Sequence, residues 1–425
     1  MALPSDSNTP ARVSALAPFS VRSFRFQWPA DLAASWAFEM ETIILGWYVL
    51  VETRSVLMLT LFASLQHIGT LLAPMFGVMG DRAGHRKVLV RMRAVYTLLA
   101  LTLMTLAYGG LLTPAYVLII VGIMGLVRPS DIGMRNALVG ATMPPDKLMG
   151  AMSIQRTTQD TAKIAGALTG AGLVALLSIG AAYTVVATLY ALSVMFTLKG
   201  ATPGAAAARH RAAENTTRAS PLTDLRAGLA YVWNTPLLLA SMCLAFLLNC
   251  TSFPMMHGLM PVMAKEIYHT DQTGLGYLVA IGGFGALMSS VIMSRIGHRV
   301  RPAQTVLIFS ASWLLSLMCF VNTTHPAAGI PFLLLAGLSQ GMSQIAMATM
   351  LMRHCDERFR GRLMGIRMLA IYGNIPGLLL AGWLIPRIGY PLTGTLYGAT
   401  ALVLLVIVAA RWRAQLWRRD AAANS

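Results

Sequence analysis

Several ionisable side chains lie inside long apolar stretches of this sequence, where a charge is costly unless it faces a partner or a water-filled cavity. The first such stretch, residues 29–51, contains Asp31, Glu39 and Glu41. A carboxylate in such a place can take up a proton when it loses contact with water and release it when water returns. This chemistry is proton coupling across a membrane, and Glu39 and Glu41 are the candidates for it.

The spacing along the first stretch separates these two candidates. Small and polar residues recur every three to four positions and so share one face of a helix: Asp31, Ser35, Glu39, Thr42 and Gly46. Glu41 lies about 200° away from Glu39 around the helix, beside apolar residues. Glu39 is therefore predicted to face a cavity and Glu41 to face another helix. The alternative for Glu39 is a static salt bridge.

A second set of charges lies in the apolar stretches near 114–137 and 150–178. Its members are two acids, each flanked by two cations: Arg128, Asp131 and Arg135, then Arg156, Asp160 and Lys163. Both acids are expected to be ion-paired, which makes them poor proton carriers. Together with Asp31 they form a predicted intramembrane charge network, whose surplus cations can face Glu39 or an anionic substrate. The alternative is a purely structural network.

The second half of the chain has no acid inside an apolar stretch and supplies uncharged polar groups instead. Those predicted to line a substrate cavity are Asn249, His257, Gln340, Gln344 and Asn374. Each of them alone is more often a hydrogen bond between helices than a ligand contact. A proton-carrying carboxylate is therefore expected in the first half.

The elements that carry these residues are membrane-spanning helices. The 425 residues are 56% hydrophobic and 12% charged, whereas a soluble protein carries about 25% charged residues. Twelve segments are long and apolar enough to cross a bilayer, near 29–51, 57–79, 89–110, 114–137, 150–178, 181–198, 237–262, 273–295, 303–322, 327–352, 363–386 and 390–410. The predicted fold class is an all-α integral membrane protein of twelve transmembrane helices in two six-helix halves.

The predicted organisation has five parts. They are a cytoplasmic tail (1–28), a six-helix half (29–198), a cytoplasmic linker with an amphipathic helix (199–236), a second six-helix half (237–410) and a cytoplasmic tail (411–425). Lys and Arg gather in alternate connectors, and the connector between the second and third spans has Arg82, Arg86, Lys87, Arg91 and Arg93. Because cytoplasmic loops are enriched in Lys and Arg, both termini are expected in the cytoplasm. The net charge of +17 reflects this topology and not nucleic-acid binding.

The two halves carry a repeat. The sequence DRAGHR at 81–86 is followed 213 residues later (294 minus 81) by SRIGHR at 294–299. The sequence LMG at 148–150 recurs at 363–365, an offset of 215 residues (363 minus 148). Two matches at nearly one offset indicate a duplication. Two related halves with a site between them at mid-membrane are typical of secondary transporters.

The stretch Gly77–Lys87 resembles the signature of the major facilitator superfamily in the loop between spans 2 and 3. Its glycines permit a tight reversal, its cations hold the loop in the cytoplasm, and its acid can act as a gate partner. The resemblance implies a gating motif of Gly77, Asp81, Arg82, Gly84 and Arg86. It extends along nearly the whole chain and is closest to the branch that contains the enterobactin exporter and macrolide efflux proteins. An ordinary positive-inside loop is the alternative.

This resemblance implies a secondary active transporter that exports a siderophore-like or drug-like molecule by alternating access, driven by proton antiport. The alternative is an inward-directed transporter of a small metabolite or siderophore. One departure is Gly166–Ala171, which lacks the proline and last glycine of an antiporter pattern in the fifth span. Antiport therefore does not follow from this motif alone.

The expected surroundings are a lipid bilayer, the bacterial inner membrane, with a small-molecule substrate and protons as partners. No nucleophile–base pair, metal cluster or phosphate loop is evident in the sequence, so we expect no enzyme activity, cofactor or metal. No nucleic-acid partner is expected either, and the protein is predicted to be a monomer.

The predicted orientation can be tested by labelling. In a variant without the native cysteines, Thr324→Cys is expected to react with a membrane-impermeant maleimide in intact cells, because its connector has no Lys or Arg. Arg209→Cys, in the basic linker, is expected to react only after the cells are lysed. The reverse labelling pattern would place both termini outside the cytoplasm.

Overall fold

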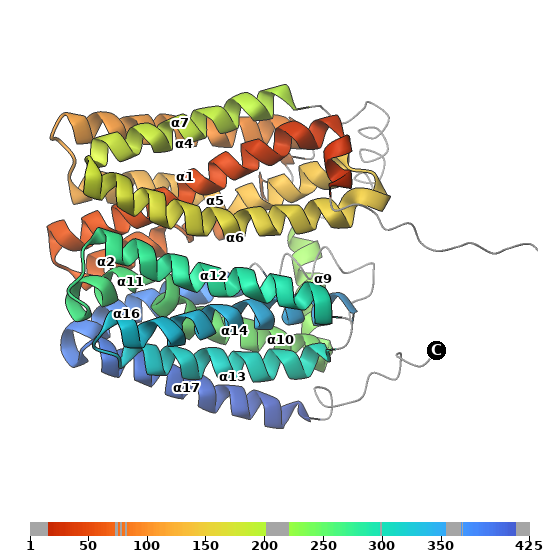
Figure 1. Cartoon of the computed structure of the whole chain (residues 1–425). Helices are drawn as coiled ribbons and strands as arrows, with labels where there is room; N and C mark the ends of the chain where they lie inside the picture. The colour runs from red at the N-terminus through yellow and green to blue at the C-terminus, as the bar shows by residue number, and fades with distance from the viewer. Residues whose placement is uncertain are drawn as a thin grey trace, which may run out of the picture.

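The computed structural model describes residues 16–72, 75–76, 79–80, 83–200, 221–297, 300–353, 367 and 369–413. Within these ranges every regular element is a helix. Figure 1 shows two bundles, one above the other, and each is built from one half of the chain. The fold is all-α, as the sequence predicts.

The bounds of the helices follow the two bundles. The first contains η1 (Ala17–Ser20), α1 (Arg22–Thr53), α2 (Val56–Leu65), η2 (Ile68–Leu72), α4 (His85–Tyr108), α5 (Pro114–Thr142), α6 (Pro145–Leu176) and α7 (Ile179–Lys199). The second contains α10 (Pro236–Phe253), η3 (Pro254–Gly258), α11 (Met260–Val262), η4 (Met263–Ile267), α12 (Gln272–Ile296), α13 (Pro302–Val321), α14 (Pro326–Arg353), η6 (Ala370–Gly373), α16 (Asn374–Ile388) and α17 (Tyr390–Arg411). Between them, α9 (Pro221–Asn234) occupies the stretch where the sequence predicts an amphipathic helix.

Eight of the described helical segments are long and apolar enough to cross a membrane. They are α4, α5, α7, α12, α13, α14, α17 and the segment Pro236–Gly258. Helices also occupy the described parts of the remaining predicted spans. α1 and α6 each have 32 residues but contain charges, whereas α2 and α16 have 10 and 15 residues. The helical membrane fold is therefore observed, and the number of twelve crossings stays a prediction.

The start of α1 differs from the predicted first span. The helix begins at Arg22, inside the predicted tail, and Pro29 lies within it. Proline cannot donate a backbone hydrogen bond, so sequence reasoning places it at a helix start. Here the helix continues on both sides of Pro29.

Side-chain caps begin several helices at one end of the molecule. Ser55, Thr113, Ser178 and Asp271 each accept a hydrogen bond from the backbone N–H three residues later. Such caps satisfy N–H groups that have no partner within the helix. The connectors that contain them lie at the left in Figure 1, away from the described ends of the chain.

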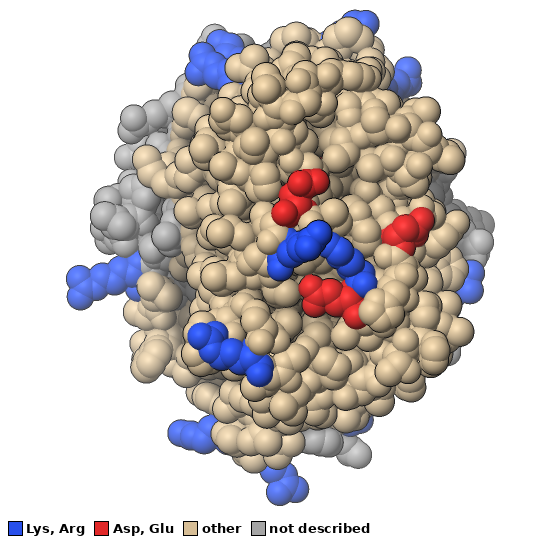
Figure 2. Space-filling view, turned by 90° about the vertical axis from the view of Figure 1, so that its left-hand side faces the viewer, with Lys and Arg blue, Asp and Glu red and all other residues tan. Residues whose placement is uncertain are grey.

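The two bundles pack directly against each other at that end. A Cβ added to Gly382 of α16 would lie 2.1 Å from Thr60 Oγ1 of α2, and Lys265 Nζ donates to the Leu50 carbonyl at 3.4 Å. Figure 2 views the molecule from this end, where few charged side chains are visible and a small group of both signs lies near the centre. The closeness of α2 and α16 leaves no room for a larger side chain at Gly382.

Close packing within the second bundle depends on glycine. A Cβ added to Gly337 of α14 would lie 2.1 Å from the Gly282 carbonyl oxygen of α12, and one added to Gly285 would lie 2.3 Å from the Leu334 carbonyl oxygen. Helices that approach this closely are typical of membrane bundles, in which small residues allow backbone contact.

We expect Gly337→Ala to push α12 and α14 apart and to destabilise the protein by about 1–3 kcal/mol. The measurement is the melting temperature of the purified protein in detergent. Gly172→Ala in α6 is the control, because no atom lies within 4 Å of a Cβ added there. Equal melting temperatures for the two variants would contradict the role of this helix contact.

Candidate functional site

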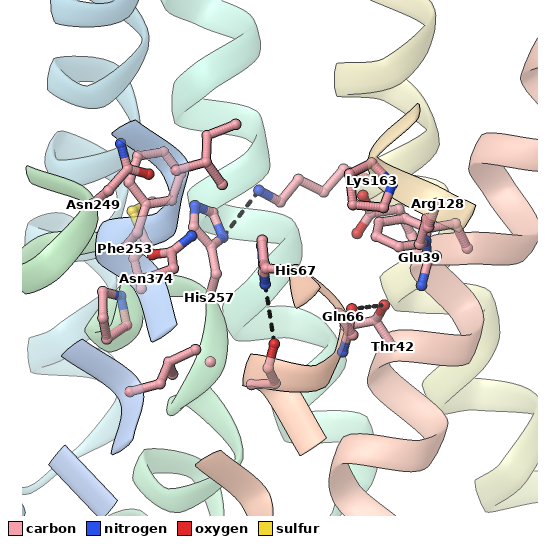
Figure 3. Close-up of a pocket in the computed structure, with 18 of the residues that line it drawn as sticks. Glu39, Thr42, Gln66, His67, Arg128, Lys163, Asn249, Phe253, His257 and Asn374 are labelled. Carbon is pink, nitrogen blue, oxygen red and sulfur yellow. Dashed lines mark hydrogen bonds between the residues drawn. The ribbon is translucent and has the colours of Figure 1, made fainter. Parts of the chain in front are cut away.

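A cavity of about 380 Å³ lies between the two bundles, near the middle of the long helices (Figure 3). Its walls are mostly apolar, and polar groups from both bundles converge on it. The first bundle supplies Glu39, Thr42, Gln66, His67, Arg128 and Lys163, and the second supplies Asn249, His257 and Asn374. A mostly apolar cavity with a few convergent polar groups is the ordinary form of a small-molecule site.

Lys163 and His257 join the two bundles across this cavity. Lys163 Nζ of α6 lies 3.1 Å from His257 Nδ1, and His257 Nε2 lies 3.0 Å from the side-chain amide of Gln340 in α14. An ammonium group only donates hydrogen bonds, so Nδ1 accepts and Nε2 carries the hydrogen. The ring is then neutral. The Gln340 amide, whose Nε2 is placed 3.0 Å from the ring, is assigned with its oxygen turned toward His257 Nε2, so that the Nε2–H donates to it.

His257 takes this position where the helix changes its winding. α10 ends at Phe253, and Pro254 begins a π-helical turn that ends at Gly258. Proline has no N–H to continue the α-helical pattern, and π-helical turns are frequent at functional sites. The local sequence thus interrupts the α-helix at Pro254, and the His257 imidazole faces the cavity at this interruption.

Glu39 and Glu41 have different surroundings. Glu39 lines the cavity and a second one of about 130 Å³ beside it. Glu41 lines neither, and its carboxylate accepts hydrogen bonds from Tyr183 and Tyr190 of α7 at 3.4 and 3.1 Å. Among the described residues, none forms an ion pair or a hydrogen bond with the Glu39 carboxylate. Among the acids of the described residues, Glu39 is therefore the one that lines the larger cavity.

Two acids and two arginines form a buried cluster in the first bundle. Arg93 pairs with Asp31 and Arg135 pairs with Asp131. The cross distances are 3.7 Å for Arg135–Asp31 and 3.9 Å for Arg93–Asp131. Gln155 of α6 donates to the other oxygen of Asp31 at 2.9 Å. Because buried charges need partners, this cluster ties α1, α4 and α5 together.

The structure corrects the predicted position of Arg93. The sequence groups it with the cations of a cytoplasmic connector, but its side chain is fully buried and also contacts Thr197 of α7. α4 already begins at His85, so Arg93 lies about two turns inside the helix. Arg91 beside it is exposed. The available signal was the position of Arg93 inside the predicted span 89–110.

Arg128 has a different acidic partner from the one that its spacing predicts. Among the described residues it forms no ion pair with Asp131, and it lies 4.0 Å from Glu41 of α1. Its guanidinium also lies over the ring of Phe38, and both residues line the cavity. Residues three apart share a helix face, but a long side chain can turn to the neighbouring helix.

The predicted grouping of Asp160 with two cations is also only partly right. Asp160 pairs with Arg156 at 3.3 Å, and the Arg156 side chain is 56% exposed. Lys163 forms no ion pair with Asp160 in the described structure and reaches across the cavity to His257. One cation of α6 is thus free of an acidic contact at ion-pair distance among the described residues.

The remaining predicted cavity residues divide into two groups. Asn249 and Asn374 line the cavity, and Asn374 Oδ1 is buried without a hydrogen-bond partner among the described residues. Gln340 and Gln344 are not among the lining residues. Gln340 contacts His257 at Nε2, the ring nitrogen that does not face Lys163, and Gln344 accepts a hydrogen bond from Arg367 at 3.1 Å.

The predicted gating motif is only partly described. Gly77, Asp81 and Arg82 lie outside the described residues. Gly84 precedes α4 with a φ of +91°, a conformation that favours glycine. Arg86 donates to carbonyl oxygens at the end of α7. The role of the motif in gating stays a prediction.

Sequence reasoning missed His67 and the two aromatic walls of the cavity, Phe38 and Phe253. His67 Nδ1 lies 3.1 Å from the Ala63 carbonyl oxygen and donates to it. A histidine within an apolar stretch was the available signal for His67. Phenylalanine gives no such signal, because apolar spans contain many. The described residues hold no cluster of three or more side chains suited to a metal ion.

Comparison with known proteins identifies relatives. The family model described as the Major Facilitator Superfamily matches residues 28–375 and 242–423. The 4-hydroxybenzoate transporter PcaK of Acinetobacter baylyi is 27% identical over 153 residues, which are 35% of this chain and 32% of that protein. The enterobactin exporter EntS of Escherichia coli O1:K1 / APEC is 26% identical over 168 residues, which are 39% of this chain and 40% of that protein. The match thus spans less than half of each curated relative.

Solved structures share the fold along nearly the whole chain. The nucleoside transporter NupG has a TM-score of 0.71 at 15% identity, with 92% of this chain and 99% of that chain covered. A POT family transporter in complex with 5-aminolevulinic acid has a TM-score of 0.70 at 13% identity, with 94% and 97% covered. The human organic anion transporter MFSD10 has a TM-score of 0.64 at 15% identity, with 91% and 99% covered. At these identities the likeness concerns the fold alone.

The buried cluster makes a prediction about stability. Arg93→Ala is expected to destabilise the protein by about 3–5 kcal/mol, because it leaves Asp31 buried without its closest cation. Arg91→Ala on the exposed side of α4 is the control and should change stability by less than about 0.5 kcal/mol. The measurement is the melting temperature in detergent. Equal losses in the two variants would show that the cluster does not stabilise the first bundle.

Proposed function

This chain belongs to the Major Facilitator Superfamily and is a multi-pass membrane transporter of small molecules, and we propose that it works by alternating access with Glu39 as its proton carrier. The observation that carries the proposal is the position of Glu39 at the cavity between the bundles. Secondary transporters bind cargo and coupling ions near the membrane midplane, between two related halves.

Glu39 differs from the other acids of the first bundle's network in its lack of a direct partner among the described residues. Asp31 and Asp131 contact arginines, Asp160 pairs with an arginine of its own helix, and Glu41 accepts two tyrosine hydrogen bonds. A paired carboxylate holds its negative charge, whereas an unpaired one beside a cavity can exchange a proton as water enters and leaves.

In the proposed cycle the two halves rock about the cavity and open it to one side of the membrane at a time. We take residues 29–198 and 237–410 as the moving halves and 199–236 as the cytoplasmic linker between them. The tails, 1–28 and 411–425, then lie in the cytoplasm. We place the protein in the inner membrane of a bacterium, as a monomer.

Export of a siderophore-like or drug-like molecule by proton antiport is the first candidate direction. The similarity to EntS, an enterobactin exporter, supports it. Inward transport of a small metabolite is the second candidate. One observation favours it, because the cations Lys163 and Arg128 line the cavity together with Glu39. In an antiporter the cargo and the proton must compete for the site, which a cationic cargo would do at Glu39. In a symporter they must bind together, as an anionic cargo would with a protonated Glu39. The charge of the cargo therefore distinguishes the two modes.

The proposed carrier can be tested in proteoliposomes with an imposed pH gradient. The cargo probes are enterobactin and 4-hydroxybenzoate, the compounds in the names of the two relatives. We expect Glu39→Gln to reduce gradient-driven transport at least tenfold, because the amide cannot carry a proton, while exchange without a gradient is retained.

Glu41→Gln is the matched control for this experiment, since Glu41 lies two residues away and lines neither cavity. It should keep most of the gradient-driven transport. If the Glu39→Gln protein accumulates cargo as the wild type does, the coupling carboxylate is elsewhere or the driving ion is not a proton.

A further inference from the structure

The structure adds Arg93, Glu39 and Glu41 to the predicted charge network of the first bundle, and the charges of this enlarged network can be matched with each other one by one. Its acids are Asp31, Glu39, Glu41, Asp131 and Asp160, and its cations are Arg93, Arg128, Arg135, Arg156 and Lys163. Four arginines have an acidic side chain at ion-pair distance: Arg93, Arg128, Arg135 and Arg156. Lys163 has none among the described residues, and its hydrogen bond goes to the neutral ring of His257. Glu39 is the acid without such a partner. The network therefore leaves one cation and one acid, and both line the cavity.

We propose that Lys163 binds the carboxylate of an organic monoanion, which takes the place of His257 on the ammonium group. This inference rests on the proposed function and names the class of its cargo. A hydrogen bond from an ammonium to a carboxylate is charge-assisted and stronger than one to a neutral acceptor. The 3.1 Å contact with His257 puts Lys163 Nζ at the cavity, within hydrogen-bonding reach of an acceptor there.

The rest of the cavity fits the body of a small organic acid. Phe38 and Phe253 form aromatic walls, and Met256 adds an adaptable apolar surface. The buried Asn374 Oδ1 has no partner among the described residues and can accept a hydrogen bond from a hydroxyl or N–H group of the cargo. The volume of about 380 Å³ is near the low end of small-molecule sites, about 300–1,000 Å³. It favours a small aromatic or aliphatic acid over a large siderophore.

Glu39 determines how this anion couples to protons. While Glu39 is ionised, its charge balances that of Lys163 and an entering anion is repelled. When Glu39 is protonated, the charge of Lys163 is left over and an anion restores neutrality. Proton and anion then bind cooperatively, and each raises the affinity for the other by the same factor. One proton therefore enters with each anion, which selects inward symport over antiport.

Other titratable groups lie around this pair and around His257, on the neighbouring elements. Besides His257 of η3, they are His67 between α2 and η2, Arg128 of α5, and Arg156 and Asp160 of α6. Arg156 and Asp160 neutralise each other at 3.3 Å, and Arg128 lies beside Glu41. Glu39 is thus expected to be the group that takes up a proton when the cargo binds.

The proposal is tested by calorimetric titration of the full-length protein in lipid nanodiscs with matched probes. Benzoate, benzamide and benzylammonium differ in charge at nearly constant size, and hexanoate with its amide and amine forms a second series. In at least one series the carboxylate is expected to bind at least tenfold more tightly than the amide and the amine. This comparison uses only the wild-type protein, so its result does not depend on whether a variant folds.

Variants assign the effect to the lysine. Lys163→Met is expected to weaken carboxylate binding at least tenfold and to leave amide binding unchanged, whereas Lys163→Arg should keep most of the affinity. Lys199→Met is the matched control, because Lys199 is an exposed lysine at the end of α7. Melting temperatures show whether each variant is folded.

The coupling is read from pH dependence in the same titrations. Carboxylate affinity of the wild type should rise between pH 8 and pH 6, by up to about tenfold per pH unit where one proton is taken up. The same titrations are repeated in buffers of different ionisation enthalpy, because the dependence of the binding enthalpy on the buffer gives the number of protons taken up. Glu39→Gln should bind carboxylate tightly with no uptake at either pH. Glu52→Gln, at an exposed glutamate near the end of α1 that lines neither cavity, should behave as the wild type.

Four outcomes separate the possible failures. The anion site is wrong if no carboxylate binds more tightly than its amide, or if Lys163→Met binds carboxylates as the wild type does. Preferred binding of the amines with proton release would overturn the anion site but support Glu39 as a carrier in an antiporter. Unchanged proton uptake in Glu39→Gln would instead overturn the proposed function.

Discussion

Asp31 contacts Arg93 and Arg135 in the buried interior of the first bundle. Because buried charges are stable only when they are paired, these contacts set the rotation of α1 against α4 and α5. About two turns further along α1 the same helix face carries Glu39, which is why that carboxylate reaches the cavity. Glu41 lies on another side of the helix and meets the tyrosines of α7. One ionic constraint near the start of α1 thus determines the surroundings of both glutamates.

The two bundles contribute unequally to the cavity. The first supplies the charged groups, and the second supplies a neutral imidazole and two asparagines. The contact between Lys163 and His257 joins them through one hydrogen bond to a neutral ring. A single hydrogen bond contributes about 1 kcal/mol, whereas a buried ion pair resists separation more strongly. A contact of this kind suits the proposed cycle, in which the two halves part and meet again.

Close backbone packing provides the rigidity that the proposed movement requires. Lipid is as apolar as the helices, so shape complementarity between small residues holds them together. Gly337 lies against Gly282 within the second bundle, and Gly382 lies against Thr60 between the bundles. The first contact stabilises one half as a unit. The second lies at the end of the molecule seen in Figure 2, where the halves pack directly against each other.

The amino-acid sequence by itself determined the class of protein and the positions of the helices along the chain. The length of the apolar stretches and the placement of Lys and Arg depend on single segments, so they can be read without knowledge of neighbouring helices. The same holds for the polar face of α1, which placed Glu39 apart from Glu41. The all-α fold is confirmed, whereas the gating and coupling roles stay predictions.

The partner of each charge was decided only by the tertiary structure. The sequence grouped Arg93 with the cations of the connector although it lies inside the predicted span 89–110, and only its contacts with Asp31 and Thr197 on other helices show that it is buried. The spacing along α5 and α6 suggested acidic neighbours for Arg128 and Lys163, but these long side chains reach Glu41 and His257 on other helices. Helical periodicity identifies residues that share a face of one helix. Contacts between helices depend on their rotation and tilt, which many distant residues set together.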